Sequence, residues 1–334
     1  PSPDNNLIAF TEDNNGRRQY DIKFLDPITL DITNPKIDDA SGNIIWSKNN
    51  KHIVYLKKDP ETLISNSVYV HTIGTSSSKD KLIYQELDPE YNIDISRSKS
   101  KKYVYINVEA TNDNEIYLVD LDDPIAKPML FLKRSTDHLY YLEHVDGEIF
   151  YVRTNINAPN FKVLKVNSLS QIDLKNADVI VEHNENIFII DLLSLENTLI
   201  LEIRENGLPE IEIVDISNQQ RNRLEYANNA YNVFLNSNNT SDQNGFYFNY
   251  SSLTSPSSIY YYNFLTNKKE IKWEKNISLY DKKNYVDDRF FIEARDGVKV
   301  PVMILRHKDT IPQNAPILFM AMVHMASLKK QGLE

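Results

Sequence analysis

The segment Lys102-Tyr103-Val104-Tyr105 decides the fold, because five similar segments accompany it at near-constant spacing along the chain. Each is a short run of β-branched, aromatic and aliphatic residues, which is typical of a strand. The other five are Leu7-Ile8-Ala9-Phe10, His52-Ile53-Val54-Tyr55, Glu148-Ile149-Phe150-Tyr151, Thr198-Leu199-Ile200-Leu201 and Gly245-Phe246-Tyr247-Phe248. Their last residues are 45, 50, 46, 50 and 47 positions apart, which predicts six repeating units.

Each unit holds more than one strand. A polar, turn-like stretch such as Ser47-Lys48-Asn49-Asn50 precedes the segment, and a second strand-like run such as Glu115-Ile116-Tyr117-Leu118-Val119 follows it. A further apolar strand comes next, as in Lys81-Leu82-Ile83-Tyr84. A period of 40–50 residues with several strands per unit indicates a β-propeller, whose blades bury one another's faces. The alternative is an all-β sandwich in which the spacing arose by chance.

The pattern changes near residue 284. Arg289–Ala294 and Val298–Leu305 are apolar runs joined by Arg295-Asp296-Gly297, and Asp-Gly supplies the positive φ that a tight hairpin needs. Pro301 lacks an N–H, so its strand is expected at a sheet edge. Ala315–Met320 has the composition of a buried strand. A second domain is therefore predicted to begin here.

Composition excludes several classes of protein. The 334 residues carry 37 Lys and Arg against 47 Asp and Glu, a net charge of −10, which argues against nucleic acid as a partner. No apolar run reaches the ~18–20 residues of a membrane helix. There is no Cys, so a disulfide scaffold and a thiolate site are excluded. We expect a cytoplasmic protein that binds neither nucleic acid nor membrane.

The sequence contains no catalytic, cofactor or metal motif. A nucleophile elbow needs G-x-S-x-G, and none of the eight glycines supplies it. The seven histidines lack the i, i+4 spacing of a helical zinc site, so we interpret them as hydrogen-bonded surface or blade-edge residues. Three acidic pairs are interpreted as solvated turn residues, namely Asp38-Asp39, Asp122-Asp123 and Asp287-Asp288.

Four stretches carry a family resemblance: Gly16-Arg17-Arg18-Gln19-Tyr20, His71–Tyr84, Tyr250–Pro256 and Ala294–Val302. Together they resemble oligopeptidase B, also called protease II, of the prolyl oligopeptidase family of serine peptidases. The resemblance runs from residue 1 to about Phe319. It implies a seven-bladed propeller that caps an α/β-hydrolase domain with a Ser–Asp–His triad.

The resemblance also divides the chain. Residues 1–284 would form about six of the seven blades, with roughly one blade and a helical segment expected upstream of Pro1. Residues 285–319 would open the α/β-hydrolase domain, and 320–334 would be a tail that departs from the family pattern. Where the family has a Tyr-Gly-Tyr-Gly-Ser-Tyr-Gly loop, this chain has Met320-Ala321-Met322-Val323. Codons for Tyr-Gly-Tyr-Gly read one base later give Met-Ala-Met-Val, so we hypothesise a frameshift after Phe319.

Glu12 is the strongest interdomain candidate. It follows the first repeat segment, and the resemblance implies a propeller glutamate that pairs with an arginine of the hydrolase domain when the two domains close. Arg17 and Arg18 are further candidates for such a contact. The alternative is that Glu12 is a surface residue in a loop and that the two arginines lie in a solvated turn.

The functional hypothesis is a non-catalytic gating propeller of an oligopeptidase-B-like enzyme, inactive alone. The family, by resemblance, hydrolyses short peptides after Arg or Lys. One alternative is half of a split peptidase, completed by a second chain that carries the catalytic domain. Another is a stand-alone binding propeller, although neither Trp46 nor Trp273 is followed by Asp as in tryptophan–aspartate repeats. A decayed gene product without function is the last alternative.

Overall fold

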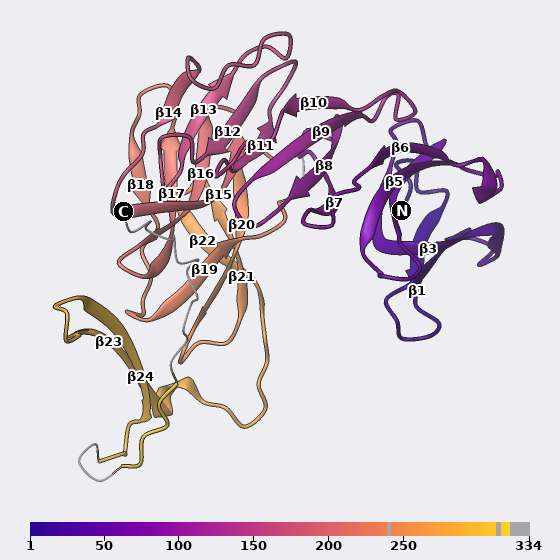
Figure 1. Ribbon diagram of the computed structural model, residues 1–334. Helices are drawn as coiled ribbons and strands as arrows, with labels where there is room; N and C mark the ends of the chain where they lie inside the picture. The colour runs from indigo at the N-terminus through magenta and orange to yellow at the C-terminus, as the bar shows by residue number, and fades with distance from the viewer. Residues whose placement is uncertain (239–241, 312–314, 321–334) are drawn as a thin grey trace.

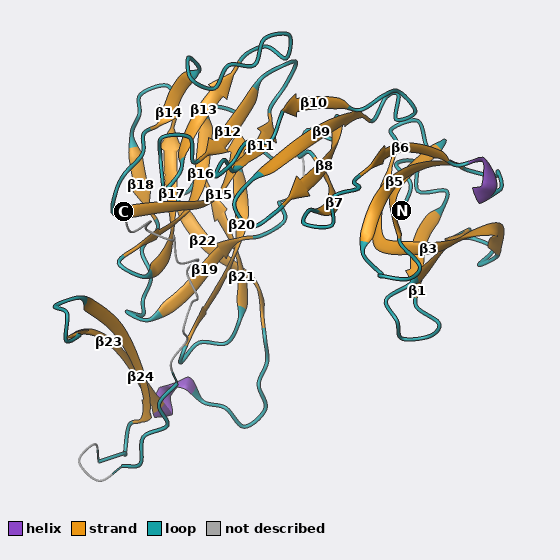
Figure 2. Cartoon of the chain, in the orientation of Figure 1, coloured by secondary structure: helices purple, strands orange, loops and turns teal. Residues whose placement is uncertain are grey.

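The computed structural model describes residues 1–238, 242–311 and 315–320. Strands make up nearly all of the regular structure in this part of the chain (Figures 1 and 2). The only helices in the described ranges are two single 3₁₀ turns, η1 (Ser77–Lys79) and η2 (Lys282–Asn284). Every strand pairs antiparallel with a strand adjacent in sequence, so each sheet is a meander.

The first sheet has six strands and combines two blades. In order these are β1 (Ile8–Glu12), β2 (Tyr20–Leu25), β3 (Ile32–Trp46), β4 (His52–Lys58), β5 (Ser65–Thr72) and β6 (Lys81–Gln85). The long strand β3 belongs to both blades: β2 pairs with it as far as Ala40, and β4 pairs with it from Ala40 onward.

Four sheets of four strands follow. The second consists of β7 (Asn92–Arg97), β8 (Tyr103–Glu109), β9 (Asn114–Asp120) and β10 (Met129–Leu132). The third consists of β11 (Tyr140–His144), β12 (Phe150–Thr154), β13 (Lys162–Val166) and β14 (Asp178–Val181). The fourth consists of β15 (Ile187–Leu195), β16 (Thr198–Glu205), β17 (Leu208–Asp215) and β18 (Arg221–Arg223). The fifth consists of β19 (Tyr231–Leu235), β20 (Gly245–Ser252), β21 (Ser258–Asn263) and β22 (Lys268–Glu274).

The six repeat segments all occupy the same place in their blades. They fall on β1, β4, β8, β12, β16 and β20, which are the second strands of successive units. The β1–β3 unit therefore has no first strand among the described residues, whereas the other five units have four strands each. The prediction of six successive propeller blades is confirmed, and the sandwich interpretation is wrong because the strands form separate small sheets in chain order.

A repeated serine turn leads into the second strand of the first three blades. The serine hydroxyl accepts the backbone N–H five residues later, and the serine N–H donates to the carbonyl of that same residue. The residue three positions after the serine has φ near +60°, so the chain reverses tightly. The serines are Ser2, Ser47 and Ser98, with Leu7, His52 and Tyr103 as partners and Asn5, Asn50 and Lys101 at positive φ.

The core is divided into layers between consecutive blades. Five buried apolar clusters lie in the described residues, the first joining β2 and β3 to β4, and the next joining the β3–β6 blade to the β7–β10 sheet. The other three join each later sheet to its neighbour. Six blades packed face to face have five interfaces. In Figure 1 the β1–β6 sheet lies at the right, the β7–β10 sheet lies beside it, and the other three four-stranded sheets lie together farther to the left.

The predicted hairpin forms a separate two-stranded sheet of β23 (Tyr285–Glu293) and β24 (Lys299–His307), at the lower left of Figure 1. Gly297 has φ +82° in the turn. Pro301 on β24 pairs with Phe291 on β23, and because the sheet has two strands, both of them are edge strands. Asp38 and Asp39 lie within β3, and Asp287 and Asp288 lie within β23, so the interpretation of these two pairs as turn residues is wrong.

The predicted buried strand at 315–320 does not form. These residues have no regular structure, and Ile317, Leu318 and Phe319 are largely exposed. A buried strand needs neighbouring strands to pair with, and the described residues provide none beside it. The tail from Ala321 to Glu334, including the frameshift hypothesis, lies outside the described residues.

Candidate functional site

A polar pocket lies where the first strands of four consecutive blades converge. It has a volume of about 370 Å³ and is lined by residues in or beside β7, β11, β15 and β19. Each of these strands is an edge strand that pairs on one side only. Propeller blades surround a central channel, so a pocket bounded by four such edges lies on the axis of the array.

Charged side chains from two preceding blades cap the open edge of β15. The Lys99 ammonium donates to the carbonyl of Ser194 at 3.0 Å, and Glu143 accepts the N–H of Ser194 at 3.2 Å. Arg153 donates to the carbonyl of Ile189 at 3.2 Å. These bonds satisfy backbone groups of β15 that no strand pairs, which is a known way to protect an edge from further strand addition.

Arg153 is the most unusual of these groups. Only 8% of it is exposed, yet it forms no ion pair within the described part of the chain. Its guanidinium carbon lies 4.1 Å from the centre of the Tyr141 ring and 4.6 Å from that of Phe161, and its Nε is buried without a hydrogen-bond partner. Burial lowers the pKa of Arg153 and that of Lys99, because removing water penalises each charged form.

Glu143 is poised to titrate near neutral pH. Burial raises its pKa to about 7, and the Ser194 N–H and the Lys99 ammonium only partly oppose that rise. Burial also raises the pKa of Asp191, which faces the same pocket. The axial pocket therefore holds cations and carboxylates that contact strand edges rather than one another.

Replacing Glu143 by glutamine should stabilise the chain at high pH and not at low pH. The pKa of Glu143 is higher in the folded chain than its ordinary value of 4.5, so the wild-type stability falls as pH rises from about 4.5 through 7. Glutamine keeps an acceptor for the Ser194 N–H and cannot ionise. We expect Glu143→Gln to add about 1–2 kcal/mol at pH 8, measured by urea denaturation.

The same variant should match wild type at pH 4.5. The exposed Glu196→Gln is the control and should change stability little at either pH. A stabilisation by Glu143→Gln that is equal at pH 4.5 and 8 would show that titration of Glu143 is not its cause.

The structure separates Glu12, Arg17 and Arg18 from the axial pocket. Glu12 ends β1 and pairs with Lys23 on β2, and this contact lowers the pKa of its carboxyl. Arg17 and Arg18 lie exposed in the β1–β2 turn, which Asp13 holds by accepting the N–H groups of Gly16 and Arg18 at 2.8 Å. Glu12 and the two arginines thus share one end of the first hairpin.

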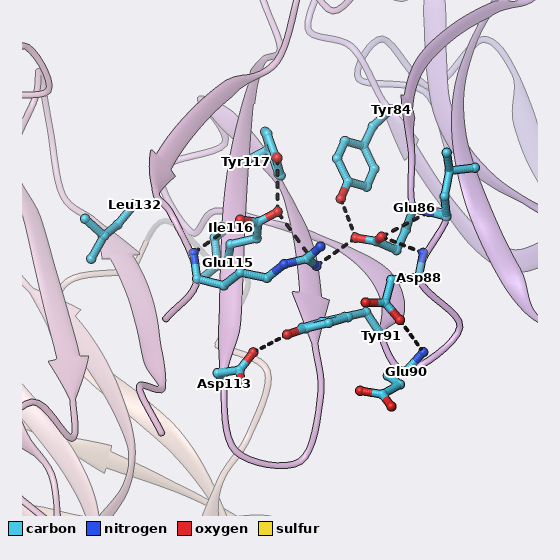
Figure 3. Close-up of polar contacts among 12 residues, drawn as sticks. Tyr84, Glu86, Asp88, Glu90, Tyr91, Asp113, Glu115, Ile116, Tyr117 and Leu132 are labelled. Carbon is cyan, nitrogen blue, oxygen red and sulfur yellow. Dashed lines mark hydrogen bonds and ion pairs between the residues drawn. The ribbon is translucent and has the colours of Figure 1, made fainter. Parts of the chain in front are cut away.

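A second polar network joins two blades on another part of the molecule (Figure 3). The Arg134 guanidinium donates to Glu86 at 2.8 Å, and its backbone N–H donates to Glu115 at 3.2 Å. The same guanidinium lies 3.8 Å from the centre of the Tyr91 ring. Both carboxylates are buried, and Tyr84 also donates to Glu86 at 2.9 Å. This network anchors the link between β6 and β7 to strand β9 and to the start of the link between β10 and β11.

Polar contacts dock the β23–β24 hairpin onto the last two blades. Asp287 accepts from the Asn228 amide at 3.1 Å and from the Thr254 hydroxyl at 3.2 Å. Arg289 donates to the carbonyl of Asn206, and Gly207 faces Pro301 so closely that an added Cβ would lie 3.1 Å from the ring. The hairpin is therefore positioned by the propeller rather than by a core of its own.

Three histidines in the described residues, His71, His138 and His144, are buried, so a surface position is wrong for them, although His144 does end the edge strand β11. His71 pairs with Asp80 at 2.7 Å, and His138 contacts the Thr154 hydroxyl at 2.9 Å. Each has found a polar partner, as a buried imidazole requires.

Ser100 and His144 form the hydroxyl–imidazole pair that most resembles a nucleophile and its base. Ser100 Oγ lies 2.6 Å from Nδ1, while Nε2 lies 3.1 Å from the carbonyl of Gly147. The carbonyl can only accept, so Nε2 carries the proton. Ser100 Oγ also contacts the hydroxyl of Ser98, within the repeated serine turn. We interpret the pair as part of that turn, because no carboxylate in the described residues orients the ring.

Comparison with known proteins identifies the blades. The family model described as "Prolyl oligopeptidase, N-terminal beta-propeller domain" matches residues 1–275. The chain belongs to the prolyl oligopeptidase family. Its match is to the propeller part of that family, which agrees with the six successive blades and with the resemblance found in the sequence.

The curated relatives are longer than this chain. It is 31% identical over 325 residues to dipeptidyl aminopeptidase BI of Pseudoxanthomonas mexicana, covering 95% of this chain and 44% of the relative. Protease 2 of Moraxella lacunata is 26% identical, with 90% and 43% covered. The solved structure of oligopeptidase B from Leishmania major superposes with a TM-score of 0.83 at 24% identity, covering 91% of this chain and 44% of that one. The chain thus spans less than half the length of these prolyl oligopeptidase relatives.

Two further findings concern the described part of this family member. No helix in residues 1–238, 242–311 and 315–320 is long and apolar enough to cross a bilayer. The same residues contain no group of three or more His, Asp or Glu side chains arranged to hold a metal ion. Sequence reasoning missed the axial pocket, although charges inside strand-like runs, at Glu143 and Arg153, are a signal that could have found it.

Proposed function

We propose that this chain is the gating propeller of an oligopeptidase-B-like serine peptidase and carries no catalytic residue of its own. The observation that supports this most directly is the succession of six blades in the part of the chain that matches the family's propeller. Residues 1–284 form the propeller in this proposal, 285–319 begin the hydrolase domain, and 320–334 are a tail. The cytoplasmic location predicted from the sequence is part of the same proposal.

A propeller can gate a peptidase by size. A rigid cap excludes folded proteins from a buried triad, whereas separation of the two domains admits short peptides. The names of the relatives, a dipeptidyl aminopeptidase and a protease, support peptides as substrates. The docked hairpin supports the proposed boundary, because its apolar residues Phe290, Ile292 and Ile304 stay exposed and fit a further layer of protein.

Glu12 is proposed to hold the two domains closed. In the described chain its partner is Lys23, so closure would exchange that lysine for an arginine of the hydrolase domain. In the protein that includes the hydrolase domain, we expect Glu12→Gln to lower kcat/KM for an arginine-containing dipeptide amide about 5-fold, since such a contact contributes about a kcal/mol.

Lys23→Gln is the matched variant. It releases Glu12 from its present partner and should leave kcat/KM unchanged or raise it. Unchanged kinetics for Glu12→Gln would remove Glu12 from the interdomain contact and leave the gating proposal standing.

The split-peptidase alternative makes a distinct prediction. The purified chain alone should not hydrolyse the dipeptide amide, and activity that appears only on mixing with a separate hydrolase-domain chain would favour two chains over one. Hydrolysis by the purified chain alone would overturn the proposed function.

A further inference from the structure

The axial pocket contains two cations that make no ion-pair contact with a carboxylate of the described residues. Arg153 and Lys99 each donate one hydrogen bond to a β15 carbonyl, and neither forms an ion pair with any described residue. A charge that is largely removed from water and not paired is costly, so a bound anion would stabilise this arrangement. The planar guanidinium of Arg153 can also present two parallel donors to a carboxylate.

The pocket selects against highly charged anions. Glu143 and Asp191 line the same space, so a dianion would meet two carboxylates as well as two cations. A single carboxylate on an otherwise neutral or cationic molecule meets about half of that repulsion. The volume of about 370 Å³ lies within the ~300–1,000 Å³ of small-molecule sites and suits a few amino-acid residues.

The strand edges around the pocket favour an end of a peptide over its middle. Lys99, Glu143 and Arg153 already occupy backbone groups of β15 at Ser194 and Ile189. An extended peptide could therefore not add to β15 along its length without displacing them. A terminal carboxylate needs only the side-chain donors.

We propose that the axial pocket binds the free C-terminal carboxylate of a short peptide, with Arg153 as its principal partner and Lys99 as the second cation. This goes beyond gating, because a size filter excludes large substrates without needing affinity for small ones. If the pocket does not bind a carboxylate, the proposed gating function still stands. If the gating function is wrong, the proposed binding site still stands.

Calorimetric titration of the purified chain tests the inference with three probes: tetra-alanine, its C-terminal amide and inorganic phosphate. We expect tetra-alanine to bind with a dissociation constant below about 1 mM. Loss of one charge-assisted hydrogen bond should weaken the affinity about tenfold. The amide and phosphate should each bind at least about tenfold more weakly. Equal binding of acid and amide, tighter binding of phosphate, or no binding of tetra-alanine would overturn the inference.

Variants identify the partner residues. Arg153→Gln should abolish the preference for acid over amide, and Lys99→Gln should reduce it. Arg153→Lys keeps the charge but loses the planar guanidinium, so its preference for acid over amide should lie between that of Arg153→Gln and that of wild type. It replaces Arg153→Gln in the test if that variant does not fold. Exposed Arg295→Gln is the control and should bind as wild type. A preference that persists in folded Arg153→Lys and Lys99→Gln at the wild-type level would also overturn the assignment.

Discussion

Replacing Phe150 by alanine is expected to destabilise the chain by about 3–5 kcal/mol, because it leaves a cavity in the buried core. Phe150 on β12 is fully buried between the second and third sheets. Its ring centre lies 4.7 Å from that of His144, 5.3 Å from that of Phe131 and 5.9 Å from that of Tyr103. Each of these rings would border the cavity that alanine leaves.

The measurement is the free energy of unfolding in urea. Phe290→Ala on β23 is the matched control, because that side chain is 44% exposed in the described residues, and it should cost less than about 1 kcal/mol. If the two variants lost equal stability, the interface between the second and third sheets would not be the buried core that the structure shows.

Replacing Arg134 by methionine is expected to cost about 3–5 kcal/mol at pH 7, because it leaves two buried carboxylates without their cation. Glu86 is 8% exposed and Glu115 5%, and Arg134 is the cation that contacts both. Burial acts to raise the pKa of Glu86, but its hydrogen bonds from Arg134, the Asp88 N–H and Tyr84 outweigh this, and the pKa is lowered.

The pH dependence distinguishes this mechanism from simple loss of packing. A carboxyl whose pKa is lowered in the folded chain contributes stability above its ordinary pKa of 4.5, and this contribution is lost as pH falls below it. Without Arg134, Glu86 should instead accept a proton more readily in the folded chain. The deficit of Arg134→Met should therefore shrink between pH 7 and about pH 5. The control is exposed Arg204→Met, and a deficit that does not change with pH would contradict the account.

The blades could be predicted from sequence because each repeat is specified locally. Alternating apolar residues select strands, and the serine turns at Ser47 and Ser98 place the reversal just before the second strand. The count of six units followed from that period alone. The shared strand β3 could not be foreseen, since a single strand serving two blades depends on the change of pairing partner at Ala40.

Polar residues within strands were the main source of error. Adjacent aspartates disfavour a strand, so the sequence predicted that Asp287 and Asp288 are solvated turn residues. Pairing with β24 and the hydrogen bonds from Asn228 and Thr254 hold them in β23 instead. The error at Ala315–Met320 is the opposite one: an apolar segment was predicted to be a buried strand. Its composition leads to burial only where other strands exist to cover it.

The axial pocket depends on distances that no local pattern contains. Lys99, Glu143 and Arg153 come from two different blades and meet on the edge of a third. Their convergence depends on how the blades turn about the axis. The sequence shows only that charges lie in or beside strands that are otherwise apolar.

The central claim is that this chain supplies blades and no nucleophile, and covalent labelling by a fluorophosphonate tests it most directly. The probe reacts with activated serines, and Ser100 beside His144 is the best candidate for one in the described chain. The account predicts no labelling of the folded chain above that of its Ser100→Ala variant. Stoichiometric labelling at Ser100 that is lost in His144→Gln would contradict it.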